Sequence, residues 1–218
     1  RRVLFRSEFL GHVVNERGVH TDPKKVEAIK NCLSPNNVSE LRSFLGLCSY
    51  YRRFIPGFAK VAACLHKLTE KGRAFNWTSE CTSAFEHLKN KLISAEILAH
   101  PDFTKPFILD TDASDFAIGA VLSQVQDGIE RPVAYASRTL SKPERNYCVT
   151  RKELLAVVNF VKHFKPYLYG KQFLIRTDHG ALAWLTRFKE PSGQIARWLE
   201  ILSSFQYEIE HRPGRKHA

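Results

Sequence analysis

Residues 107–112 begin with three apolar side chains and end with Asp110, Thr111 and Asp112, and we expect them to form a β-strand with carboxylates at its end. Successive side chains of a strand point to opposite faces, so Asp110 and Asp112 are expected to share one face. Two carboxylates at the end of an otherwise apolar strand are costly unless a cation binds there. The alternative interpretation of Asp112 is a turn residue, because Asp favours turns.

Two further strands are expected to form a hairpin after this strand. Residues 118–126 and 129–137 carry the apolar content of strands, and Asp127-Gly128 between them is a typical two-residue hairpin turn. A fourth strand is predicted over residues 171–178 and ends at Asp178. A helix over residues 181–188 should follow, so Asp178 could serve as its cap as well as a ligand.

A helix is predicted to begin near Thr150, which stands at capping-box spacing from Glu153. At about 100° per residue, Glu153 falls on the side of Val157 and Phe160, whereas Lys152 falls on the polar side. A Glu that only caps its helix would be exposed, so an acid facing the protein interior favours a functional role. A later helix is expected over residues 194–204, with a final strand over 205–211.

The first hundred residues read as mainly helical. A short strand is expected over residues 8–14, and helices are predicted after the capping residues Asp22, Asn37 and Thr78, with a further one over 59–72. Tyr50 and Tyr51 next to Arg52 and Arg53 are typical of a nucleic-acid contact, and equally of a solvated helix end. A connector over 95–106 places the domain boundary near Pro106.

Composition narrows the class of protein. The 218 residues carry a formal net charge of +11, which implies an anionic partner such as nucleic acid. No apolar run approaches the length of a membrane span and no signal peptide is visible, so we expect no membrane partner and an intracellular location. The five cysteines form no CxxC pair and the histidines no HExxH pattern, so no zinc-type site and no histidine metal site are expected. Since the chain has no Met, we expect it to be part of a longer polypeptide.

Several motifs occur in order along the chain and together resemble one family. The motifs TDAS, GAVLSQ, AYASRTL, ERNY, TRKELLAVV and RTDHGAL resemble the ribonuclease H domain of gypsy-type LTR retrotransposon Pol polyproteins. In the first half, FLGHVV, ELRSFLGLCSYYRRFIPGFAK and FNWTSECTSAFEHLK resemble the thumb and connection of the same reverse transcriptases. The resemblance implies an α/β fold: a ribonuclease H-like mixed five-stranded sheet with flanking helices over 107–218, C-terminally incomplete, preceded by a mainly helical thumb and connection region over 1–106.

The resemblance also implies an activity: metal-dependent endonucleolytic hydrolysis of the RNA strand of RNA/DNA hybrids, within a retrotransposon reverse transcriptase. Asp112, Glu153 and Asp178 would be the catalytic residues and the ligands of Mg²⁺, with Mn²⁺ as the alternative ion. The residues expected to contact nucleic acid are Arg52, Arg53, Ser114, Arg138 and Tyr147.

The partners implied are the RNA/DNA hybrid, the primer-template duplex, and the upstream palm and fingers and downstream integrase segments of the same polyprotein. The expected locations are the cytoplasm, within virus-like particles, and the nucleus. No YxDD-type polymerase motif occurs in the sequence, so polymerase activity is not assigned to it.

A second function remains open, namely a non-catalytic nucleic-acid-binding or interaction module derived from such an element. The family has a fourth acid, which would fall after Ala218, and Cys64 and Glu96 stand where members of the family have Pro. These two features favour the binding module. The presence of all three other acids favours the enzyme.

Overall fold

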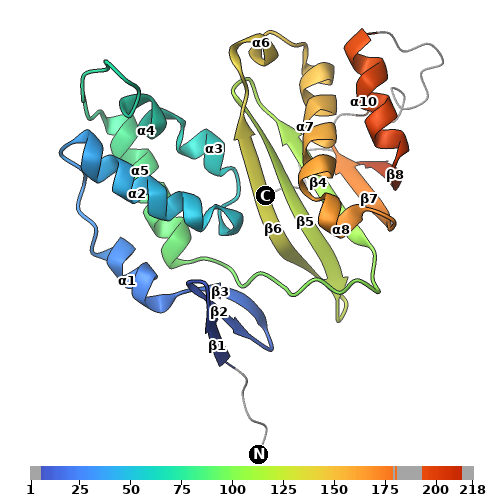
Figure 1. Ribbon diagram of the computed structural model, residues 1–218, viewed down its shortest axis with the longest axis horizontal. Coiled ribbons are helices and arrows are strands. Elements are labelled where there is room, and N and C mark those ends of the chain that lie inside the picture. Colours follow the sequence, from blue (N-terminus) through green and yellow to red (C-terminus); the bar gives the residue numbers. More distant parts are fainter. Residues whose placement is uncertain (1–5, 179, 181–192, 213–218) are drawn as a thin grey trace, which may run out of the picture. The chain divides into compact units, whose positions relative to one another are not determined.

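A computed structural model describes residues 6–178, 180 and 193–212 (Figure 1). The helix predicted over residues 181–188 lies outside the described residues. The chain divides into two compact units. The N-terminal unit comprises Arg1–His100 with Ala134–Ala136, and the C-terminal unit comprises Pro101–Val133 with Ser137–Ala218.

The C-terminal unit is built on a five-stranded sheet in the order β6-β5-β4-β7-β8. Strand β4 pairs antiparallel with β5 and parallel with β7, and β7 pairs parallel with β8, so the sheet is mixed as predicted. The strands are β4 (Phe107–Ala113), β5 (Ala117–Gln126), β6 (Ile129–Thr139), β7 (Gln172–Thr177) and β8 (Gln206–His211).

The turn between β5 and β6 confirms the predicted hairpin. Asp127 has a φ of 53° and Gly128 a φ of 77°. Positive φ at both central residues is the signature of a type I′ turn, whose twist matches that of the flanking strands. The sequence signal was therefore sufficient here.

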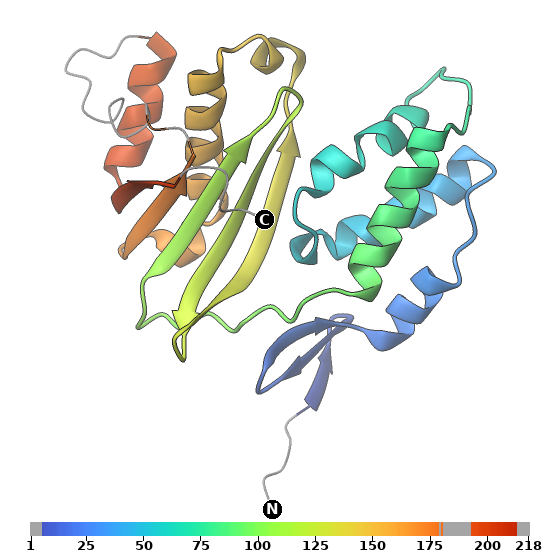
Figure 2. The same ribbon diagram turned by 180° about the vertical axis from the view of Figure 1, so that it is seen from behind.

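Helices cover one face of this sheet (Figures 1 and 2). Helix α7 (Val149–His163) packs on β4 and β5, and α10 (Gly193–Ser203) packs on α7. Two single-turn helices, α6 (Lys142–Arg145) and α8 (Lys165–Leu168), flank α7 in the chain. Alternate residues of β4, including Phe107 and Leu109, are fully buried, as the period of two predicts.

The N-terminal unit begins with a three-stranded antiparallel sheet, β1 (Arg6–Phe9), β2 (His12–Asn15) and β3 (Gly18–Thr21). The single strand predicted over residues 8–14 was wrong, because the chain turns at Leu10 and Gly11, where φ is 45° and 64°. Leu seldom adopts a positive φ, so Leu10 carries no turn signal in the sequence. The phenolic hydroxyl of Tyr51 donates to the Gly11 carbonyl at 2.6 Å and holds this turn.

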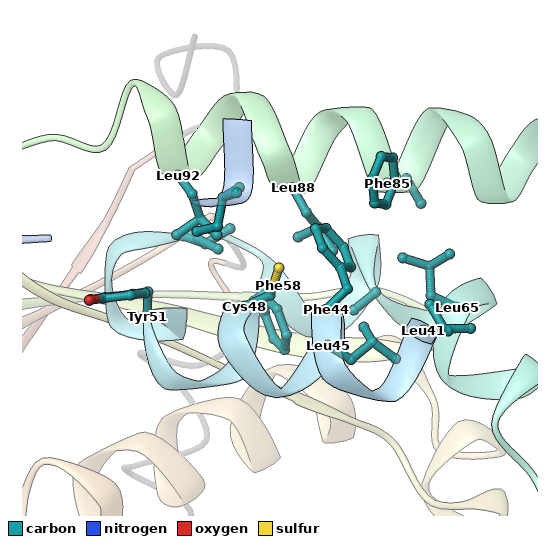
Figure 3. Close-up of a cluster of buried hydrophobic side chains, with 14 of the residues drawn as sticks. Leu41, Phe44, Leu45, Cys48, Tyr51, Phe58, Leu65, Phe85, Leu88 and Leu92 are labelled. Atoms are coloured by element: carbon teal, nitrogen blue, oxygen red, sulfur yellow. The ribbon is translucent and has the colours of Figure 1, made fainter. Parts of the chain in front are cut away.

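Helices follow, and their apolar faces form one core. They are α1 (Pro23–Lys30), α2 (Val38–Tyr50), η1 (Arg52–Phe54), α3 (Phe58–Val61), α4 (Ala63–Leu68) and α5 (Ser79–Ile93). The predicted caps Asp22, Asn37 and Thr78 each accept a backbone N–H of their helix. The helix predicted over residues 59–72 is instead two short helices. Figure 3 shows Phe44 of α2 facing Phe85 of α5, with ring centroids 4.4 Å apart.

The structure also describes the length of the helices and the state of the cysteines. In the part of the chain that the structure describes, no helix is long and apolar enough to cross a bilayer. All five cysteines are free thiols. Cys48 and Cys81 are buried, and burial raises the pKa of the Cys48 thiol to about 12.

Candidate active site

Three acids from separate elements converge in the C-terminal unit. Asp112 lies near the end of β4, Asp178 directly follows β7, and Glu153 lies in the second turn of α7. One carboxylate oxygen from each lies within 4.8 Å of those of the other two. Because β4 and β7 run parallel with Asp110 opposite Arg176, the residues two further along each strand reach the same edge of the sheet.

Glu153 is the buried member of this acid cluster. Its side chain accepts a hydrogen bond at Oε1 from the Ala113 backbone N–H at 3.2 Å. Its Oε2 is buried without a hydrogen-bond partner among the described residues. Burial, together with the charges of Asp178 and Asp112, raises the pKa of Glu153 to about 8. A buried carboxylate oxygen without a donor is the kind of atom that a cation would satisfy.

The three acids repel one another when all are ionised. At a separation of 4.8 Å and an effective dielectric constant of about 20, each ionised pair costs roughly 3 kcal/mol. Divalent cations relieve such repulsion, and a cluster of carboxylate oxygens without His or Cys suits hard ions such as Mg²⁺ and Mn²⁺. The residues present therefore fit a divalent metal ion.

The turn after Asp112 is held by its own side chains. Ser114 Oγ donates to the Ala117 carbonyl at 2.9 Å and accepts from the Ala117 N–H at 3.1 Å. The structure thus gives the hydroxyl of Ser114 a role in the turn. Lys152 Nζ pairs with Asp115 at 2.8 Å, and this hydrogen bond with Lys152 lowers the pKa of Asp115.

Two details of α7 differ from the sequence interpretation. The N-cap of the helix is Cys148, so Glu153 is not the third residue of a capping box after Thr150. Lys152 is 6% exposed and is not on a polar face. Its aliphatic stem is buried while its ammonium reaches the carboxylate of Asp115 in the turn between β4 and β5. Helical periodicity does not reveal such a pairing between residues distant in sequence.

The other nucleic-acid candidates of the C-terminal unit lie in packed settings. Arg138 makes a two-pronged pair with Glu144, with Nη1 and Nη2 at 2.8 and 3.0 Å from the carboxylate oxygens, and its Nε donates to Asn159 Oδ1 at 3.2 Å. Tyr147 is half-buried, with the Arg151 guanidinium 4.5 Å from its ring centroid. The structure does not bring Arg138 or Tyr147 into the acid cluster.

Arg52 and Arg53 belong to the N-terminal unit, in η1. The guanidinium of Arg52 lies 5.3 Å from the centroid of the Phe58 ring, a cation–π contact. Arg53 is half-buried, and its Nε has no hydrogen-bond partner among the described residues. Tyr51 is fully buried, so the aromatic residue next to Arg52 is part of the core rather than a surface platform.

Comparison with known proteins shows which families this chain resembles. Residues 77–175 match the family described as the RNase H-like domain found in reverse transcriptase. Over most of its length the chain is similar to retrovirus-related Pol polyproteins of Drosophila melanogaster: 42% identical to that of transposon 412 over 95% of the chain, and 44% to that of transposon 297 over 97%. The chain is a relative of the retrotransposon Pol polyproteins. The Tf2-3 polyprotein of Schizosaccharomyces pombe is a further relative, 39% identical over 95% of the chain.

The chain spans only part of its relatives, namely 17%, 20% and 16% of these three polyproteins. Its fold is similar to that of a foamy viral protease-reverse transcriptase solved with double-stranded DNA, with a TM-score of 0.80, 24% identity, and coverage of 95% of this chain and 38% of that one. The same viral protein solved with an RNA/DNA hybrid gives a TM-score of 0.77 at 24% identity, covering 98% of this chain and 30% of that one. At this identity the likeness concerns the fold.

Proposed function

We propose that the C-terminal unit is a ribonuclease H that hydrolyses the RNA strand of RNA/DNA hybrids, as part of a retrotransposon reverse transcriptase. The observation that carries the proposal is the convergence of Asp112, Glu153 and Asp178 within 4.8 Å, with Glu153 Oε2 buried and without a hydrogen-bond donor. Acids serving only as caps or turn residues would have no reason to meet from three elements.

Two Mg²⁺ ions bound by these carboxylates would supply a nucleophile made from water and stabilise the charge that builds on the leaving oxygen. The residues of the chain contribute the geometry. Glu153 is fixed by the Ala113 N–H, and because its pKa is raised to about 8 it is mostly protonated at neutral pH unless a cation lies beside it. Asp112 and Asp178 are exposed, so their carboxylates remain accessible to a phosphodiester backbone.

A nucleic-acid substrate is supported by two independent features. The net charge of +11 favours a polyanion. The foamy viral reverse transcriptases of similar fold were solved with double-stranded DNA and with an RNA/DNA hybrid. We extend these partners to this chain as part of the proposal, together with the other segments of its polyprotein.

The proposal is tested with a labelled RNA/DNA hybrid and matched duplexes of RNA alone and DNA alone. Wild-type protein with Mg²⁺ should cut only the RNA strand of the hybrid. Glu153→Gln and Asp112→Asn should each lower the cleavage rate at least about a hundredfold while leaving hybrid binding in place. Glu200→Gln, at an exposed position of α10, is the matched control and should cleave normally.

Binding of the hybrid without cleavage by the wild-type protein would overturn the enzymatic proposal. It would favour the alternative function, a binding module with a vestigial acid cluster. Cleavage that survives Glu153→Gln would show that the reaction does not use this site.

A further inference from the structure

A second set of charged residues lies beside the acid cluster on the sheet. The guanidinium of Arg176 in β7 donates from Nε to Asp110 Oδ1 at 2.8 Å and from Nη1 to Glu130 Oε2 at 2.9 Å, while its Nη2 reaches both carboxylates. The Arg176 side chain is only 12% exposed. Burial acts to lower the pKa of Arg176, but the hydrogen bonds with Glu130 and Asp110 outweigh it and raise that pKa above its ordinary value.

This charged network ties together strands that are not all neighbours. Asp110 of β4 stands directly opposite Arg176 in the parallel β4–β7 register. Glu130 belongs to β6, at the far side of β5 from β4. Ser123 of β5 donates from Oγ to Glu130 Oε1 at 2.8 Å, so β5 is tied in as well. One guanidinium therefore links the parallel half of the sheet to its antiparallel half.

The network lies immediately before the proposed metal ligands in sequence. Asp112 follows Asp110 by two residues, and Asp178 follows Arg176 by two residues. Because side chains alternate with a period of two, each ligand shares the strand face of the network residue that precedes it. The carboxylates at the two strand ends repel each other when ionised. The ion pair between Arg176 and Asp110 holds β4 and β7 together two residues before them.

We propose that Arg176, through its paired hydrogen bonds with Asp110 and Glu130, is a positioning residue that sets the spacing of Asp112 and Asp178 for a divalent cation. The inference rests on the proposed function, since it concerns the metal affinity of the same site. The planar fork of Arg makes two bidentate pairs, which the ammonium of Lys does not reproduce.

Positioning and simple electrostatics predict opposite results when Arg176 is changed. Loss of a positive charge near three carboxylates would by itself strengthen cation binding. Loss of positioning would weaken it, and removal of groups that orient metal ligands typically costs 10- to 100-fold in metal affinity. The sign of the change in affinity therefore distinguishes the two effects.

The experiment is a calorimetric titration of the metal-free protein with Mn²⁺ alone. Arg176→Met should bind Mn²⁺ about tenfold or more weakly than wild type. Arg176→Lys keeps the charge and loses the fork, and should also bind more weakly. Gln172→Met is the matched control at the start of β7, where it removes only a hydrogen bond to Glu208, and it should bind like wild type. Thermal unfolding of each variant confirms that it is folded, and Arg176→Lys keeps the test valid if Arg176→Met does not fold.

Each outcome has a separate meaning. Unchanged or tighter Mn²⁺ binding by Arg176→Lys and Arg176→Met, beside a wild type that binds, would overturn the positioning role and leave the proposed function standing. Equal weakening in Gln172→Met would also overturn it, because any loss of sheet stability would then suffice. Absence of Mn²⁺ binding by the wild type would overturn the proposed function, and this inference with it.

Discussion

The backbone N–H of Ala113 donates a hydrogen bond to Glu153 Oε1 across 3.2 Å and so joins the end of β4 to α7. The bond uses one oxygen of the carboxylate and leaves Oε2 buried without a donor among the described residues. The same strand end carries Asp112 one residue earlier. The fold therefore holds a nearly fully buried acid against a second acid, and this arrangement costs stability when no cation is present.

The first prediction concerns the pH dependence of stability without metal. The pKa of Glu153 is raised from 4.5 to about 8 in the folded protein. Below pH 4.5 both states hold the proton and this contribution to stability is fully present. Between pH 4.5 and 8 only the unfolded state releases the proton, so the free energy of unfolding should fall by at most about 1.4 kcal/mol per pH unit. Glu153→Gln should lack this fall.

The measurement is urea unfolding in EDTA at several pH values. Unfolding is monitored by hydrogen exchange of peptides from β4 and β7, so that the C-terminal unit is observed. Glu200→Gln, exposed on α10, serves as the control and should keep the wild-type profile. A wild-type profile that is flat between pH 5 and 8 would contradict a raised pKa for Glu153.

The second prediction distinguishes the effect of Asp112 on metal binding from its effect on the stability of the fold. Asp112→Asn removes one of three mutually repelling carboxylates, so the metal-free protein should melt at the same or a higher temperature than wild type. Mn²⁺ should raise the melting temperature of the wild type and raise that of Asp112→Asn much less. Asp127→Asn, in the β5–β6 turn, is the control, because Asn tolerates the φ of 53° found there. Equal Mn²⁺ stabilisation of wild type and Asp112→Asn would remove Asp112 from the site.

The sequence was sufficient for the parts of the C-terminal unit that depend on local chemistry. The apolar residues before Asp112 predicted that it lies at a strand end, and Asp127-Gly128 specified the hairpin turn. Helical spacing correctly predicted that Glu153 faces the protein interior. The mixed five-stranded sheet itself was predicted from the order of motifs, because the pairing of β4 with β7 joins residues more than sixty positions apart and has no local signal.

The contacts that lay outside prediction are those between residues distant in sequence. Lys152 was assigned to a polar face, yet it is buried with its ammonium on Asp115. The pair between Arg176 and Asp110 could have been found, since alternation places each on the face of the acid two residues later, but only once the register of β4 and β7 was known. The turn at Leu10 had no signal at all, because its positive φ is stabilised by tertiary contacts with Tyr50 and Tyr51.

The third prediction concerns two glycines of the N-terminal unit. Gly18 has a φ of 141°, and a Cβ there would lie 2.1 Å from the Leu98 carbonyl oxygen, which accepts the Val19 N–H. Gly18→Ala should therefore destabilise this unit by more than about 2 kcal/mol. Gly46→Ala, in the middle of α2 with open space around it, is the matched control and should stabilise by about 0.5–1 kcal/mol. Urea unfolding followed by hydrogen exchange of α2 peptides measures both, and a Gly18→Ala protein as stable as wild type would contradict the β3–Leu98 pairing.

The fourth prediction concerns the contact of the N-terminal unit with nucleic acid, for which Arg53 is the sharper of the two arginine candidates. Arg52 already rests on the ring of Phe58, whereas Arg53 is half-buried and its Nε is buried without a hydrogen-bond partner among the described residues, so we expect any phosphate contact at the outer end of its guanidinium. With a net charge of +11, the chain should bind RNA/DNA hybrid with an affinity that falls steeply as salt rises, because bound counterions are released. Each phosphate contact makes the plot of log affinity against log salt steeper by about 0.9. Arg53→Gln should therefore make this plot shallower by about the same amount.

The test of this contact is a titration of labelled hybrid at four or more salt concentrations with wild type, Arg53→Gln and Lys91→Gln. Lys91 is exposed on α5 and loses the same charge, so its variant corrects for the general effect of net charge. A salt-independent affinity of the wild type would exclude a surface that follows the phosphate backbone. Equal slopes for Arg53→Gln and Lys91→Gln would show that Arg53 acts only through net charge. A shallower slope for Arg53→Gln alone is the result expected from a direct phosphate contact, since only a group at the phosphate displaces its counterion.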